Sequence, residues 1–159
     1  MSELPPDEPP PPADEDQEPT IFDQPDGTDW YLAWLVNMSD FGVEHAVTLH
    51  VSGAIITGTL ISGRSFFREL AELTRGRGVP GDGTITDTMA TSYEAFAENM
   101  YPETQESDRP TRPVGYVHLR NARVITGEGT VIPRNGTLWR GKASAIDGVA
   151  LGALEVTRG

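Results

Sequence analysis

The run from Gly58 to Ser65 comes closest to a known chemical site. It is one residue short of the phosphate-binding loop, which needs lysine where Arg64 stands because a compact ammonium must reach between the β and γ phosphates. Thr59, Leu60 and Ile61 instead continue the β-rich pattern of the preceding residues, and no apolar run ending in a magnesium-binding aspartate follows. The sequence therefore favours a strand and a helix here over a nucleotide site.

Histidines, serines and carboxylates give no stronger signal of catalysis or metal binding. His50 and His118 fall on the polar faces of predicted strands, and the pattern does not bring together the three or four ligands that zinc requires. None of the serines stands in a G-x-S-x-G elbow. Carboxylate pairs such as Glu94 and Glu98 fall on the outer faces of predicted helices, where charge is usually solvated. We therefore predict a protein that is not an enzyme, with no cofactor and no metal.

Trp139-Arg140-Gly141-Lys142 places a tryptophan beside two cations in an acid-rich chain. One interpretation buries Trp139 in the core and points Arg140 and Lys142 outward from one strand face. The other makes this cationic edge a docking point for an acidic partner, including the chain's own amino terminus, because Trp and Arg are over-represented at interface hot spots. Both interpretations stand at this stage. The candidate interaction residues are Trp139, Arg140, Lys142, Arg120, Arg123 and Asp147.

Periodic apolar residues divide the chain into helices and strands. Trp30, Trp34 and Met38 recur at helical spacing as an apolar stripe, and Thr28 or Asp29 can cap that helix. The predicted elements are a helix from residue 30 to about 42, strands at 44–51 and 55–61 joined by Ser52-Gly53, a helix from Ser62 or Ser65 to Thr74, a helix at 86–100, a polar loop at 101–113, and three strands between 116 and 156. In the helix that ends at Thr74, the pattern predicts that Phe66, Leu70 and Leu73 are buried and that Glu69 lies outside.

The last three strands determine the predicted architecture. Val117 and Leu119 alternate with His118, and Asp147-Gly148 has the composition of a two-residue type I′ hairpin turn. Glycines within strands, at Gly58 and Gly141, indicate bends or bulges. We predict an α+β fold with a small curled antiparallel sheet, a partly closed barrel of about five strands, and two or three amphipathic helices.

The chain's acidity is concentrated at its amino terminus. Of the 24 acidic residues in the 159-residue chain, ten lie in the first 29 residues. These 29 residues include eight prolines but no Lys or Arg, so the remainder of the chain has 14 acidic and 12 basic residues. Such a segment cannot bury enough apolar surface to offset its ordering entropy. We predict a disordered acidic, proline-rich tail at 1–28 and a single α+β domain at 29–157. The absence of cysteine, of a signal sequence and of an 18-residue apolar stretch favours a cytoplasmic protein.

Several segments, in order, resemble one family: Val51–Ser62 with the following Phe66–Leu70, then Val117–Arg123, Leu138–Lys142 and Ile146–Gly152. They are similar to the gas vesicle accessory proteins usually called GvpU. The resemblance implies a cytoplasmic accessory factor without known catalysis that acts in the assembly or clustering of protein-shelled gas vesicles. It also implies gas vesicle shell or accessory proteins as partners. Self-association is predicted separately, because a cationic edge and an anionic arm on one molecule favour weak, salt-sensitive association among copies.

The main alternative is an RNA-binding small barrel of the Sm type, because a bent second strand and paired final strands are similar to that fold. Nucleic-acid binders normally carry a basic surface that neutralises phosphates, whereas this chain has a formal charge of −12. We therefore predict partners that are neither nucleic acid nor membrane.

Overall fold

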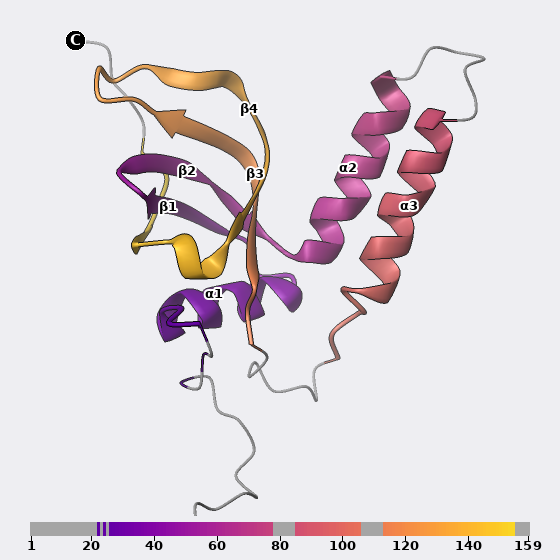
Figure 1. Cartoon of the computed structure of the whole chain (residues 1–159), viewed down its shortest axis with the longest axis horizontal. Helices are drawn as coiled ribbons and strands as arrows, with labels where there is room; N and C mark the ends of the chain where they lie inside the picture. The colour runs from indigo at the N-terminus through magenta and orange to yellow at the C-terminus, as the bar shows by residue number, and fades with distance from the viewer. Residues whose placement is uncertain (1–21, 23, 25, 78–84, 106–112, 155–159) are drawn as a thin grey trace, which may run out of the picture.

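The computed structural model describes residues 22, 24, 26–77, 85–105 and 113–154. Their elements, in order, are α1 (Trp30–Asp40), β1 (His45–Val51), β2 (Ala54–Ile61), α2 (Gly63–Arg77), α3 (Ile85–Asn99), β3 (Tyr116–Ile125), β4 (Val131–Lys142), a 3-10 turn η1 (Ala143–Ala145) and β5 (Gly148–Leu151). The predicted α+β fold with five strands and three helices is confirmed (Figure 1). Residues 1–21, 23 and 25 of the predicted tail and residues 106–112 of the predicted 101–113 loop lie outside the described residues.

The five strands form one antiparallel sheet in the order β4-β3-β2-β1-β5. β4 and β5 are the two edges, so the sheet is curled but not closed. Residues 143–147 alone lead from one edge to the other, which requires the sheet to bend round until its edges approach. The prediction of a hairpin turn at Asp147-Gly148 is wrong, because β5 pairs with β1 and not with β4. The Asp147-Gly148 dipeptide suits a tight turn, but it does not indicate that the strand after it pairs with β1, about a hundred residues earlier in the chain.

The β1–β2 hairpin turns at Ser52-Gly53, as predicted. Their φ angles of 49° and 83° are the pair of positive values that a tight hairpin needs. Asp147, which directly precedes β5 beside β1, braces this turn, since its carboxylate accepts a hydrogen bond from the Ser52 amide at 2.7 Å.

Glycine within the strands has two different structural reasons. Gly58 lies at a register shift between β2 and β3, where a Cβ would come within 3.0 Å of the Arg120 carbonyl oxygen; the predicted bulge is confirmed. Gly141 pairs with Val117 without a register shift, so β4 has no bulge at this position. The indole of Trp139 folds over Gly141 instead, and a Cβ would meet its ring at 2.2 Å.

The core lies between the curled sheet and α1, which crosses beneath the strands in the view of Figure 1. Each leucine buried there stabilises the fold by roughly 1.5–3 kcal/mol relative to an exposed one. The apolar cluster contains Leu32, Leu35 and Val36 of α1 with Val47, Leu49, Ile56, Leu60, Val117, Leu119, Ala122 and Ala143.

The helices α2 and α3 form a hairpin that stands beside the sheet, with α3 on the outer side (Figure 1). Small buried residues, Ala71 on α2 with Ala90 and Ala97 on α3, let the helices approach closely. Ion pairs complete the contact: Arg64 and Arg68 of α2 with Glu98, and Arg75 with Glu94.

Two details of the α2 prediction are wrong. Leu73 is exposed, because the far end of the hairpin has no sheet residues beside it. Glu69 is turned toward the sheet, where it pairs with Arg120. The helix begins as predicted at Ser62, whose hydroxyl accepts a hydrogen bond from the Ser65 amide at 3.1 Å.

Candidate interaction surfaces

The outward side of α1 carries an aromatic surface. Asp29 caps the helix, its carboxylate accepting a hydrogen bond from the Tyr31 amide at 3.1 Å, and thereby sets where the helix begins. From that start the core-facing positions fall on Leu32, Leu35 and Val36. The stripe of Trp30, Trp34 and Met38, which helical spacing marks as apolar, therefore points away from the core.

We define the aromatic surface as Phe22, Trp30, Tyr31 and Trp34. Their rings form a continuous chain, with centroids 5.4 Å apart for Phe22 and Trp30, 6.0 Å for Trp30 and Tyr31, and 6.2 Å for the stacked pair Tyr31 and Trp34. Phe22 is 68% exposed, Trp30 49% and Trp34 38%, whereas Tyr31, which joins the two tryptophans, is half-buried against the core. Contiguous exposed apolar surface of this kind is typical of protein interaction sites.

The cationic segment of β4 is built around a buried histidine of β3. His118 was predicted on a polar strand face, but it is buried, because Phe66 of α2 and Tyr101 cover that face with ring centroids 4.9 Å and 5.4 Å from the imidazole. Burial, with the neighbouring Arg140 cation, lowers the pKa of His118 to about 3. Its ring is therefore neutral over the physiological range.

Arg140 is held over this histidine. Its Nε donates to His118 Nε2 at 3.2 Å, so the histidine carries its proton on Nδ1. The guanidinium also lies 3.4 Å from the centroid of the Tyr116 ring, a cation–π contact. Arg140 remains exposed despite these contacts, and Lys142, two residues along the same face, is exposed as well.

The six residues predicted as an interaction site do not form one cluster. Trp139 is half-buried against the core while Arg140 and Lys142 point outward, as in the first interpretation of this segment. Arg120 is held between two carboxylates, with Nε–Oε1 of Glu69 at 2.9 Å and Nη1–Oε2 of Glu44 at 2.8 Å. Arg123 is exposed near a register shift of β3, and Asp147 braces the β1–β2 turn.

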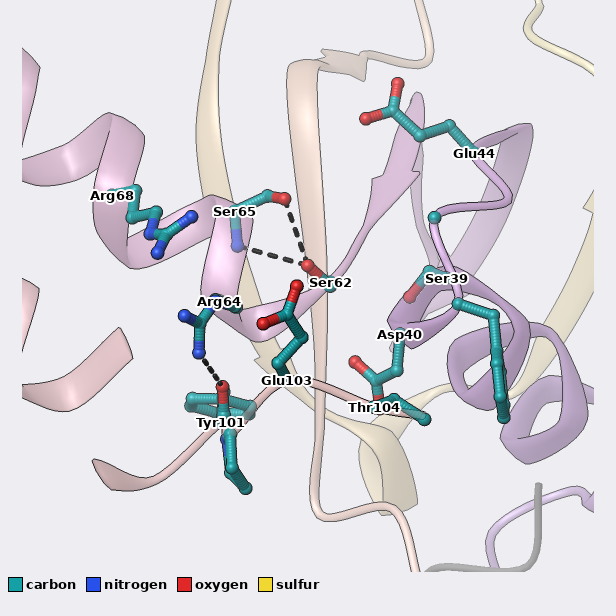
Figure 2. A pocket seen from close by; sticks show the side chains of 13 residues that line it. Ser39, Asp40, Glu44, Ser62, Arg64, Ser65, Arg68, Tyr101, Glu103 and Thr104 are labelled. Atoms are coloured by element: carbon teal, nitrogen blue, oxygen red, sulfur yellow. Dashed lines mark hydrogen bonds between the residues drawn. The ribbon is translucent and has the colours of Figure 1, made fainter. Parts of the chain in front are cut away.

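A polar cleft of about 350 Å³ lies between the end of α1, the start of α2 and residues 101–104 (Figure 2). Its groups are already engaged with one another. Arg64 donates to the Tyr101 carbonyl oxygen at 3.2 Å and to Glu98 at 2.6 Å, and the hydroxyls of Ser62 and Ser65 are 3.0 Å apart.

This cleft occupies the place where a phosphate-binding loop would have to lie. β2 runs to Ile61 and α2 begins at Gly63, which leaves no loop to surround a phosphate. The carboxylates of Asp40, Glu44 and Glu103 also line the cleft and oppose an anion. In the described part of the chain, no three His, Asp or Glu side chains are grouped to hold a metal ion.

The comparison with protein families decides the assignment. The model of the family described as "Gas vesicle protein GvpU-like" matches residues 29–154. The chain belongs to the GvpU-like family. The match extends from the N-cap of α1 to just beyond β5, so the outward face of α1 and the cationic segment of β4 both lie within the part that GvpU-like proteins share. No curated protein and no solved structure matches the chain.

In the described residues of this GvpU-like protein, no helix is both long enough and apolar enough to cross a bilayer.

Sequence reasoning missed the aromatic surface, although a signal was present. Leu32, Leu35 and Val36 are apolar as well as Trp30 and Trp34, so α1 is apolar on nearly every side. Such a helix is either buried all round or leaves one apolar side for a partner. Only the packing of α1 against the sheet shows which apolar side of the helix stays exposed.

Proposed function

We propose that this protein acts in gas vesicle assembly or clustering, in the cytoplasm, by associating with gas vesicle shell or accessory proteins and with copies of itself. The observation that carries the proposal is the exposed aromatic surface, of which Trp30, Tyr31 and Trp34 lie within the family-matched part of the chain. Membership of the GvpU-like family supports a gas vesicle role, and the surface supports association as the means.

The aromatic surface suits a protein partner. Tryptophan supplies a large, rigid contact area with few rotamers to immobilise, and hot-spot tryptophans each contribute about 2 kcal/mol or more to binding. No basic residue occurs in α1, and Asp26 and Asp29 flank its start. The partner surface that fits best is therefore apolar with a basic or neutral rim.

Co-sedimentation with purified gas vesicles tests this proposal. Replacing both Trp30 and Trp34 with alanine is expected to lower the vesicle-bound fraction at least about tenfold, since each change removes a hot-spot contact. Ile132→Ala is the matched control, because Ile132 is an exposed apolar residue on β4, away from α1. Equal binding by the double variant and the control would contradict the proposal.

We also propose that the acidic amino terminus of one copy associates weakly with the cations of another, in a salt-sensitive way. Arg123, Arg140 and Lys142 are exposed, whereas Arg120 is neutralised by its carboxylate partners, so the first three carry this contact. Deleting residues 1–21, which preserves the Asp29 cap, is expected to weaken light scattering from self-association at low salt. Scattering that is unchanged across ionic strengths would rule out this contact.

A further inference from the structure

One side of α3 is apolar and largely exposed in the described part of the chain. Four large side chains lie along it, and they are exposed: Ile85 by 75%, Met89 by 46%, Phe96 by 41% and Met100, just after the helix, by 63%. We call these four residues the α3 stripe. The predicted helix is thus confirmed, but of its residues only Ala90 and Ala97 are buried, and the stripe touches α2 where the Phe96 ring packs on Phe67, with centroids 5.6 Å apart.

Charge is absent from this side of α3. At 100° per residue, the stripe spans about 60° of the helix surface, and its acids, Asp87, Glu94 and Glu98, project from the opposite side. Glu94 and Glu98 are neutralised there by the arginines of α2. An uncharged apolar face in a chain with a formal charge of −12 fits a partner helix that is equally uncharged.

The order of the stripe residues is symmetric along the helix. Ile85 and Met89 are four residues apart, as are Phe96 and Met100, and both pairs are equally distant from a midpoint between Ser92 and Tyr93. Two identical antiparallel helices related by a two-fold axis at that midpoint bring Ile85 against Met100 of the second copy, and Met89 against Phe96. An isologous contact requires this kind of self-complementarity.

From these observations we propose that two copies of this chain associate through their α3 helices, packed antiparallel about a two-fold axis near Ser92. The position of α3 supports this, because it is the outer helix of the hairpin and α2 stands between it and the sheet (Figure 1). The two hairpins then form a four-helix arrangement in which the α3 stripes are the shared core.

The contact is small, and the dimer is therefore weak. A helix of 15 residues is roughly 22 Å long, so one helix pair falls below the roughly 1,200 Å² of a standard stable interface. A micromolar dissociation constant is expected. The dimer goes beyond the proposed vesicle function and does not depend on it, but it would give each assembly two aromatic surfaces.

Sedimentation of the full chain across a concentration series tests the dimer. Met89→Glu is expected to raise the dissociation constant at least about tenfold, because a carboxylate would be buried without a partner. Thr91→Glu adds the same charge to an exposed position on the other side of the same helix and is expected to leave dimerisation unchanged. Circular dichroism melts establish that both variants are folded. A monomer at all concentrations, or equal effects of the two variants, overturns the proposal.

Single cysteines test the geometry independently, because the chain contains none of its own. For helix axes 8–10 Å apart, the Cα atoms at the crossing point are roughly 4–5 Å apart, within the range of a disulfide. Ser92→Cys is expected to form a covalent dimer under mild oxidation, and Thr91→Cys is expected to remain monomeric. A yield of covalent dimer from Thr91→Cys that equals or exceeds the yield from Ser92→Cys overturns the antiparallel arrangement. Loss of the dimer in Met89→Glu with vesicle binding retained distinguishes this contact from the proposed function.

Discussion

The buried imidazole of His118 makes the stability of this protein depend on pH in a window that can be stated in advance. Its pKa is about 3 in the folded protein and 6.5 in the unfolded chain. Between these values the unfolded chain binds a proton that the folded protein does not. Stability is therefore lost as pH falls below about 6.5, and none of this penalty applies above that pH.

The magnitude at pH 5.5 follows from the unfolded pKa alone. One pH unit below 6.5 the penalty is about 1.4 kcal/mol, and at pH 7.5 it is negligible. The folded pKa lies so far below 5.5 that the folded protein binds almost no proton at this site, and only the unfolded chain contributes. A working pH of 5.5 also stays above the isoelectric point of about 4.5, where low net charge promotes precipitation.

The assay is urea denaturation of the protein and of His118→Gln at pH 7.5 and 5.5. Glutamine can still accept the hydrogen bond from Arg140 but does not titrate. Carboxylates titrate in both proteins, so their contribution cancels in the difference between the two pH dependences. The native protein is expected to lose about 1.4 kcal/mol more than the variant on acidification. Equal losses would refute the burial of a neutral His118.

Two further predictions concern the positions that shape the candidate surfaces. Gly141→Ala is expected to destabilise the fold by about 1–3 kcal/mol, because the new methyl group collides with the Trp139 indole. Gly76→Ala is the control: the helix α2 has open space at Gly76, so this change is expected to stabilise the fold by up to about 1 kcal/mol. Thermal melts that rank the two variants in the opposite order would contradict the packing described. Asp29→Ala is expected to cost about 1 kcal/mol through loss of the bond to the Tyr31 amide, measured by urea denaturation, and no loss would mean that the cap is not formed.

Local patterns were sufficient to predict most elements of this fold. The three helices and the β1–β2 turn each depend on residues close together in sequence, so period, cap and glycine signals were enough. The edge position of β5 depends on pairing between Thr48 and Ala150, about a hundred residues apart, and no local signal encodes it.

The candidate surfaces were harder to predict, because periodicity shows which residues share a face and not which face meets the core. Trp30 and Trp34 share an apolar side of α1, yet the shorter side chains of Leu32 and Leu35 are the ones that fill the space beneath the sheet. His118 shows the reverse case. Its polar strand face is buried because α2, inserted between β2 and β3, folds back to cover it.

The three surfaces lie on separate elements, and under the proposed function that separation has a consequence. The aromatic surface belongs to α1, the α3 stripe to the outer helix of the hairpin, and the exposed cations to β3 and β4. Occupying one surface therefore leaves the others accessible, so a copy bound to a vesicle can also hold a second copy. Linking two weak sites in this way raises avidity far above either single affinity. A variant that loses only the α3 contact should then still bind vesicles but gather them less, most clearly at high salt, where the contact between the acidic amino terminus and the cations is screened. A variant that loses only the aromatic surface should dimerise normally and leave vesicles unbound.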